Sequence, residues 1–102
     1  MTRGLLFGID YDKTWTADPE FWRNVVELAL QHQHAFVCVT ARNVDREDVE
    51  AGIDGLMPIV YAGDQWKKKA AEECGFAVDI WIDDRPNTIA PPKPDQPQGR
   101  TA

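Results

Sequence analysis

Carboxylates are concentrated in two short segments of the sequence. Asp10 and Asp12 lie in the segment DYDKT, and Asp83 and Asp84 are adjacent in the segment WIDDRP. Carboxylates that gather in one cleft repel one another unless a cation holds them. Oxygen ligands of this kind suit Mg²⁺, which in turn recruits phosphate oxygens. If the fold brings the two segments together, the pattern indicates a magnesium site that supports phosphoryl chemistry.

Both acidic segments directly follow apolar runs, which indicates where they lie in the fold. The run at 5–9 is continuously apolar rather than alternating, as expected for a strand buried on both faces of a parallel sheet. Similar runs at 35–39, 58–62 and 78–82 predict three further strands. In open α/β folds, ligands bind beyond the carboxyl ends of the strands. The segments DYDKT, VTAR and WIDDRP each end a predicted strand, so we expect them to meet at that edge.

Helical patterns separate the predicted strands. Asp18 and Pro19 are typical of an N-cap and a first helical residue, and apolar spacing extends this helix over roughly 19–33. A thinner amphipathic pattern predicts a weaker helix that ends at Gly55, and a third helix is predicted over 65–74. Strands that alternate with helices predict an α/β protein, with a three-layer Rossmann-like fold and a parallel sheet of about four strands.

Three consecutive lysines, Lys67, Lys68 and Lys69, open the third predicted helix, which we expect Asp64 to cap. Helical spacing places Lys67 toward the buried face, with Lys68 as the second choice. The apolar side of this helix is expected to carry Trp66, Ala70, Ala71 and Cys74.

The length and the net charge limit the number of domains and the kinds of binding partner that we expect. The 102 residues fit one compact domain, and the net charge of −6 lacks the basic footprint that binding to nucleic acid or an anionic membrane usually needs. The first apolar run is too short for a signal peptide or a membrane span, so we expect a cytoplasmic protein. Residues 1–90 are expected to form the domain. Residues 91–102 are rich in proline and poor in apolar groups, which predicts an extended or disordered tail.

The motifs and their order resemble those of the haloacid-dehalogenase-like (HAD) hydrolase superfamily. DYDKT follows the first buried strand, VTAR the second, and WIDDRP the fourth, with a lysine-bearing helix before the last. The resemblance runs from about Leu5 to Ile89, and WIDDRP also resembles the deoxyribonucleotidase-like branch locally. It implies a Mg²⁺-dependent phosphatase, a phosphomonoester hydrolase that acts through an aspartyl-phosphate intermediate.

The resemblance also implies a role for each motif residue. Asp10 would attack phosphorus, and Asp12 would protonate the leaving group and then activate water. Thr40 would hydrogen-bond the phosphoryl oxygens, and the family lysine, here Lys67, would offset charge on Asp10 and the phosphoryl group. The implied metal residues are Asp10, Asp12 through its backbone carbonyl, Asp83 and Asp84.

Further candidates for substrate contact lie beside these motifs: Thr14, Trp15, Arg42 and Lys68. Trp15 is included because it lies in the loop just after the nucleophile, whereas most of the other tryptophans are expected in the core. For Arg42, a surface salt bridge explains the residue equally well.

Many HAD enzymes carry an inserted cap domain, and this sequence has no room for one. The intervals from Asp10 to Thr40 and from Thr40 to Lys67 are each filled by one predicted helix and one predicted strand. The site is therefore expected to be open, unless a second subunit of a homo-oligomer covers it. Capless relatives often act on large substrates, such as proteins or nucleic-acid ends. The resemblance therefore implies a phosphorylated substrate that can be a macromolecule.

Three alternatives remain open at this stage. Asp10 and Asp12 could be ordinary turn or cap residues, since aspartate is common after strands. The chain could also be a non-catalytic binding module that keeps the fold and the cation site. A receiver-type phospho-acceptor uses similar residues, but its acceptor aspartate follows the third strand, and here the third predicted strand ends in Ala62 and Gly63.

Overall fold

The computed structural model describes residues 4–92. Within this range the chain forms the predicted strands and helices in the predicted order. The residues of the predicted tail from 93 onward lie outside the described range. The strands are β1 (Leu6–Ile9), β2 (Ala35–Thr40), β3 (Ile59–Tyr61) and β4 (Ile80–Ile82); the α-helices are α1 (Pro19–Gln31), α2 (Arg46–Ile53) and α3 (Lys67–Glu73); and the short 3₁₀ helices are η1 (Trp15–Ala17) and η2 (Pro86–Thr88).

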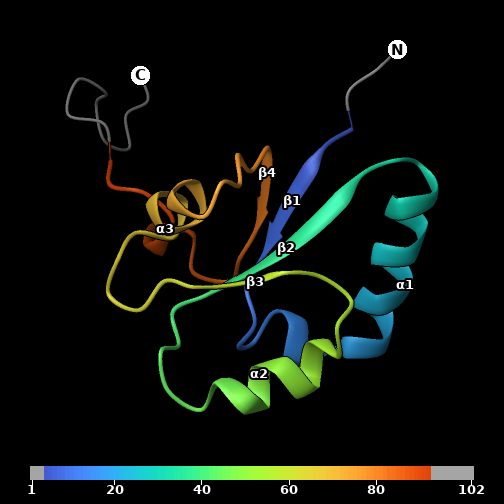
Figure 1. The fold of residues 1–102 in the computed structure, drawn as a ribbon, viewed down its shortest axis with the longest axis horizontal. Coiled ribbons are helices and arrows are strands. Elements are labelled where there is room, and N and C mark those ends of the chain that lie inside the picture. Colours follow the sequence, from blue (N-terminus) through green and yellow to red (C-terminus); the bar gives the residue numbers. More distant parts are fainter. Residues whose placement is uncertain (1–3, 93–102) are drawn as a thin grey trace, which may run out of the picture.

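The four strands form one parallel sheet in the order β3-β2-β1-β4. The central strand β1 pairs with β2 on one side and with β4 on the other, so that Gly8 lies between Val37 and Trp81. Helices α1 and α2 pack on one face and α3 on the other (Figure 1). The predicted α/β, three-layer, Rossmann-like arrangement is therefore confirmed.

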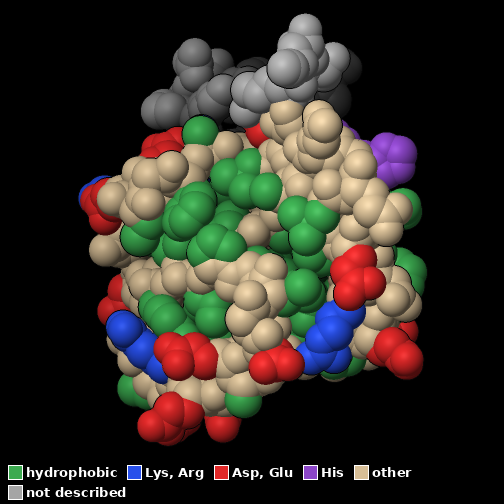
Figure 2. All heavy atoms as spheres, turned by 45° about the vertical axis from the view of Figure 1, so that its right-hand side comes forward, with side chains coloured by type: hydrophobic (Ala, Val, Ile, Leu, Met, Phe, Trp, Pro, Cys, Tyr) green, Lys and Arg blue, Asp and Glu red, His purple; other side chains and the backbone are tan. Residues whose placement is uncertain are grey.

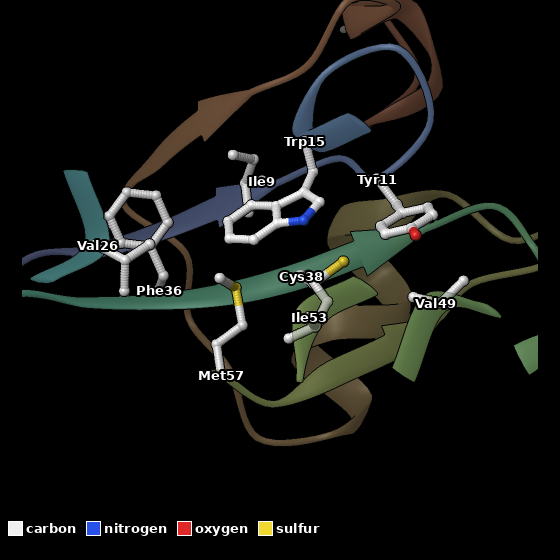
Figure 3. Packing of buried hydrophobic residues seen from close by; sticks show 9 residues of the cluster. All are labelled: Ile9, Tyr11, Trp15, Val26, Phe36, Cys38, Val49, Ile53 and Met57. Carbon is white, nitrogen blue, oxygen red and sulfur yellow. The ribbon is translucent and has the colours of Figure 1, made fainter. Parts of the chain in front are cut away.

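The larger part of the core lies between the sheet and helices α1 and α2 (Figure 3). Trp15 is fully buried there, and its Nε1 donates a hydrogen bond to the carbonyl oxygen of Gly52 at 3.2 Å. The prediction that Trp15 contacts substrate is wrong, because η1 turns the indole inward under the end of the sheet. The buried members of this cluster are Ile9, Tyr11, Trp15, Val26, Phe36, Cys38, Val49, Ile53 and Met57.

The opposite face of the sheet is covered by α3 through Ala70 and Ala71, which pack on β2 and β3. The helix is shorter than the sequence predicts, and the residues on either side of it, Trp66 and Cys74, are exposed rather than buried. The predicted Asp64 cap is also absent, because Trp66 occupies the N-cap position without a side-chain hydrogen bond. At α1 the prediction holds: the side chain of Asp18 accepts a hydrogen bond from the backbone N–H of Phe21.

The connections between the described strands are short. The link from β1 to β2 contains η1 and α1, and the link from β2 to β3 contains α2, so residues 4–92 hold no inserted domain over the carboxyl ends of the strands. In the same range, no helix is both long enough and apolar enough to cross a membrane.

Coverage of the sheet is less complete at the β4 edge. Hydrophobic side chains gather in the centre of the face that comes forward when the α1 side is turned toward the viewer (Figure 2). Leu28 of α1 and Ile80 of β4 are exposed, whereas β2 is buried from Phe36 to Thr40. The most deeply buried strand is therefore β2, an inner strand of the sheet, and its carboxyl end carries Thr40.

The burial of Trp15 predicts a large loss of stability on truncation. Trp15→Ala should lower the free energy of unfolding by about 3–5 kcal/mol, because it leaves a cavity in the core. Trp66→Ala removes the same side chain from an exposed position and should change this free energy by less than about 1 kcal/mol. Urea unfolding of both variants checks the difference. Equal losses would contradict the placement of Trp15.

Candidate active site at the carboxyl ends of the strands

The two acidic segments meet at the carboxyl edge of the sheet. Asp10 directly follows β1, and Asp83 directly follows β4, the neighbouring parallel strand. The backbone N–H of Asp10 donates to the carbonyl oxygen of Ile82 at 3.0 Å, which continues the β1–β4 pairing into the loops. Carboxylate oxygens of Asp10, Asp83 and Asp84 all lie within 4.8 Å of one another. Parallel pairing thus joins residues from opposite ends of the chain in one cluster.

Lys67 lies at the centre of this cluster. Its Nζ is 2.9 Å from Oδ1 of Asp10 and 2.7 Å from Oδ2 of Asp83, and its side chain is only 4% exposed. Lys68 and Lys69 are exposed. Among the three lysines, the predicted inward placement of Lys67 is therefore confirmed, while its catalytic role stays a prediction.

Thr14 joins Asp10 to Asp84, whereas Lys67 joins Asp10 to Asp83. Its buried hydroxyl lies 3.5 Å from Oδ2 of Asp10 and 3.3 Å from Oδ1 of Asp84, and it accepts a hydrogen bond from the backbone N–H of Asp84. We predicted contact between Thr14 and substrate. The structure instead places this hydroxyl between two acidic side chains, where it holds DYDKT against WIDDRP.

The three carboxylates of the cluster lie beside a buried cation, and the pKa values of Asp10, Asp84 and Lys67 are all shifted from their ordinary values. Burial raises the pKa of Asp10 to about 6, although its hydrogen bond with Lys67 opposes the shift. A hydrogen bond with Asp10 lowers the pKa of Asp84. For Lys67, burial lowers the pKa, but the hydrogen bonds to Asp83 and Asp10 outweigh it and the net shift is upward. The opposite shifts of the two carboxyl pKa values reflect two groups held close together, and a cation bound between them would relieve their repulsion.

Two of the three carboxylates are better placed than the third to hold a metal. Asp83 uses one oxygen for Lys67 and the other for the backbone N–H of Arg85, and its side chain is 1% exposed. Asp10 and Asp84 line a pocket of about 170 Å³. Opposite ligands of an octahedral Mg²⁺ are about 4.2 Å apart, so the oxygens, which lie within 4.8 Å, need to move only slightly to bind one. The residues therefore fit Mg²⁺, with Asp83 as the anchor of Lys67.

Asp12 has a different partner. Its two carboxylate oxygens accept hydrogen bonds from Nε and Nη2 of Arg42 at 2.9 and 2.8 Å. Of the two possibilities that the sequence left open for Arg42, the structure shows the salt bridge. The Asp12 side chain is about half exposed and lies outside the three-carboxylate cluster, and contact of its backbone carbonyl with a metal stays a prediction.

Thr40 and Lys68 are not placed as predicted. Thr40 is fully buried, its Oγ1 accepts a hydrogen bond from the backbone N–H of Arg42, and its neighbour Ala41 lines the pocket instead. The Lys68 side chain lies outside that pocket and lines a different one beside Ala90 and Pro91. A role for the Thr40 hydroxyl toward phosphoryl oxygens remains a prediction that requires local movement.

Two cations that the sequence analysis did not single out also line the pocket: Lys13 and Arg85. Each directly follows a motif aspartate in the sequence, and this position could have indicated that its side chain lies near the site. Lys13 has a positive φ of 66°, so the backbone of the DYDKT turn, rather than residue spacing, decides where its side chain points.

No family model, curated protein or solved structure matches this chain. The resemblance to the HAD superfamily therefore rests on the motif residues and their order alone.

Binding of Mg²⁺ should stabilise the fold. A ligand present at 100 times its dissociation constant adds about 2.7 kcal/mol to the free energy of unfolding. Thermal melts of the wild type should shift upward with added Mg²⁺ and return after chelation. Asp84→Asn should lose most of this shift, whereas Asp54→Asn, at an exposed position after α2, should keep it. An equal shift in both variants would place the metal elsewhere.

Removal of the buried ammonium should destabilise the protein. Lys67→Ala leaves Asp10 and Asp83 buried without their cation, a change that costs about 3–5 kcal/mol in comparable pairs. Lys69→Ala breaks an exposed pair with Glu73 and should cost less than about 1 kcal/mol. Urea unfolding at neutral pH measures both. A Lys67→Ala variant as stable as Lys69→Ala would show that the ion pair does not hold the site together.

Proposed function

We propose that this protein is a Mg²⁺-dependent phosphomonoester hydrolase that uses Asp10 as a covalent nucleophile. One observation carries the proposal: Asp10 lies at the end of the central strand, is bound by a buried lysine, and lines an open pocket together with Asp84. A carboxylate held in this way is oriented and cannot turn away from a bound phosphoryl group. The order of the motifs supports the same reaction class.

In the first half of the reaction, a carboxylate oxygen of Asp10 attacks phosphorus. Asp12 first leaves Arg42 and takes up a proton from solvent. The bond between Asp10 and phosphorus then forms, the bond to the leaving-group oxygen breaks, and Asp12 donates its proton to that oxygen. Lys67 holds Oδ1 of Asp10 throughout, and the neighbouring Lys13 and Arg85 face the same pocket as the anionic phosphoryl oxygens. Mg²⁺, held by Asp10 and Asp84, would supply charge neutralisation for these oxygens.

In the second half, Asp12 takes a proton from water, and the water oxygen attacks phosphorus to release phosphate and regenerate Asp10. For both proton transfers, Asp12 has to exchange its two hydrogen bonds with Arg42 for the leaving group or the water. The pair is partly exposed, so this exchange costs little compared with the opening of a buried pair. Arg42 thus acts as a resting partner for the acid–base residue.

A non-catalytic module with the same cation site is the alternative. The observation that favours it is the pairing of Asp12 with Arg42, which occupies both carboxylate oxygens of the proposed acid–base residue. The two functions differ in one observable: only the hydrolase forms a covalent phosphoenzyme.

Substitution of the two DYDKT aspartates separates their roles. With a good leaving group, Asp12→Asn should still accept a phosphoryl group on Asp10 but hydrolyse it about 10²–10⁴ times more slowly, because acid–base help is lost. Asp10→Asn should form no phosphoenzyme. Intact-protein mass spectrometry after incubation with an aryl phosphate and Mg²⁺ measures the added phosphoryl group, with Asp54→Asn as the control. Label on Asp10→Asn would exclude Asp10 as the nucleophile, and no label in any variant together with no turnover would favour the binding module.

A further inference from the structure

A second pocket of about 300 Å³ adjoins the one that contains Asp10 and Asp84. The two share Ala41, Lys67 and Thr88 as walls, so a molecule with its phosphoryl group beside Asp10 can extend directly into the second pocket. A volume near 300 Å³ lies at the lower end of the range for small-molecule sites. The rest of the wall of this pocket is formed by residues 63–66, which link β3 to α3 (Figure 1), and by Asn87 of η2.

The character of this wall is set by Trp66. The residue precedes Lys67 at the start of α3, and its side chain is 41% exposed in spite of its size. Burial of Lys67 against Asp10 and Asp83 fixes the rotation of the helix, and this rotation leaves Trp66 outside the core. An aromatic face at the edge of a reaction pocket binds flat rings by stacking.

The polar residues of the wall indicate what else the pocket accepts. Gln65 and Asn87 are among the residues that line it, and their side-chain amides can both donate and accept hydrogen bonds. Among the described residues that line it, Asp64 carries the acidic group, while the cation, Lys67, is already held by two carboxylates. A leaving group with a second negative charge would meet Asp64 without a free cation to balance it, so the pocket favours uncharged groups.

We propose that this second pocket is a leaving-group subsite for an uncharged, ring-containing alcohol, with Trp66 as the stacking platform and Asp64 as the residue that rejects a second anion. The inference rests on the proposed function, since it assigns the pocket to the alcohol half of the phosphomonoester. Trp66 and Asp64 are specificity residues in this account, and neither takes part in bond breaking.

The test compares two phosphomonoesters, 2-naphthyl phosphate and glycerol 1-phosphate, as substrates of the wild type and of variants. The ratio of variant to wild-type kcat/KM for each substrate removes the difference in leaving-group reactivity. Trp66→Ala should lower kcat/KM for 2-naphthyl phosphate by about 10- to 100-fold, the effect of one lost stacking contact. The value for glycerol 1-phosphate should change by less than about twofold, since this substrate has no ring to stack.

Two control variants distinguish the loss of the aromatic ring from a general effect on folding. Trp66→Phe keeps an aromatic face and should restore most of the activity toward 2-naphthyl phosphate. Leu30→Ala removes an exposed apolar side chain from α1 and should leave both substrates unaffected. Equal losses on both substrates in Trp66→Ala, or no loss on either, would overturn the subsite while the hydrolase proposal stands. No turnover of either substrate by the wild type would overturn both.

The proposed role of Asp64 is tested with a second pair of substrates, of which one carries an additional negative charge. Asp64→Asn should raise kcat/KM for 4-carboxyphenyl phosphate by about fivefold, the effect of removing one like charge near the protein surface. The value for phenyl phosphate should stay unchanged. Asp54→Asn, a substitution of the same type outside the pocket, should alter neither substrate. An unchanged ratio between the two substrates in Asp64→Asn would overturn the role given to Asp64.

Discussion

The buried ammonium of Lys67 is the constraint on which the rest of the structure depends. Charges removed from water cost several kcal/mol each, and the loss is offset only when geometry and partners are good. Lys67 meets this condition with one oxygen from the end of β1 and one from the end of β4. The first residue of α3 is thereby fixed to two adjacent strands, which explains why the helix begins there and packs through Ala70 and Ala71.

This arrangement leaves the carboxyl edge of the sheet short of positive charge. Asp83 is satisfied by Lys67 and a backbone N–H, but Asp10 and Asp84 lie on either side of the Thr14 hydroxyl, and among the described residues no cationic side chain bridges these two carboxylates. A divalent cation bound by both carboxylates would offset their charge. The fold thus brings an oriented carboxylate, acidic side chains that could hold a cation and an open pocket to one place, and the proposed phosphoryl transfer through an aspartyl phosphate would use all three.

The sequence predicted the parts of this structure that depend on local pattern. Continuous apolar runs located the strands, and helical spacing identified Lys67 as the inward lysine. The contacts that were missed join distant residues: the Arg42 pair with Asp12 spans 30 positions, and the Thr14 contact with Asp84 spans 70. Periodicity carries no information about such pairs.

The errors at tryptophan residues have the same origin. Trp15 was placed at the site because it follows the nucleophile, but a 3₁₀ turn reverses its direction into the core. Trp66 is predicted on the buried side of the third helix because of its spacing from Ala70 and Cys74, but it precedes the first turn of α3 and is exposed. In both cases the local backbone, a 3₁₀ turn at Trp15 and the start of α3 at Trp66, decided the direction of the side chain. Trp66 rather than Trp15 therefore lines a pocket at this edge of the sheet.

The most direct test of this account is a structure of the protein with Mg²⁺ and beryllofluoride, which forms a stable mimic of an aspartyl phosphate. The account predicts beryllofluoride joined to a carboxylate oxygen of Asp10 and Mg²⁺ bound by Asp10 and Asp84. It also predicts that Lys67 stays within hydrogen-bond distance of Asp10 and Asp83. Beryllofluoride on another carboxylate, or Mg²⁺ bound away from Asp10 with Asp10 unmodified, would contradict the assignment of this site.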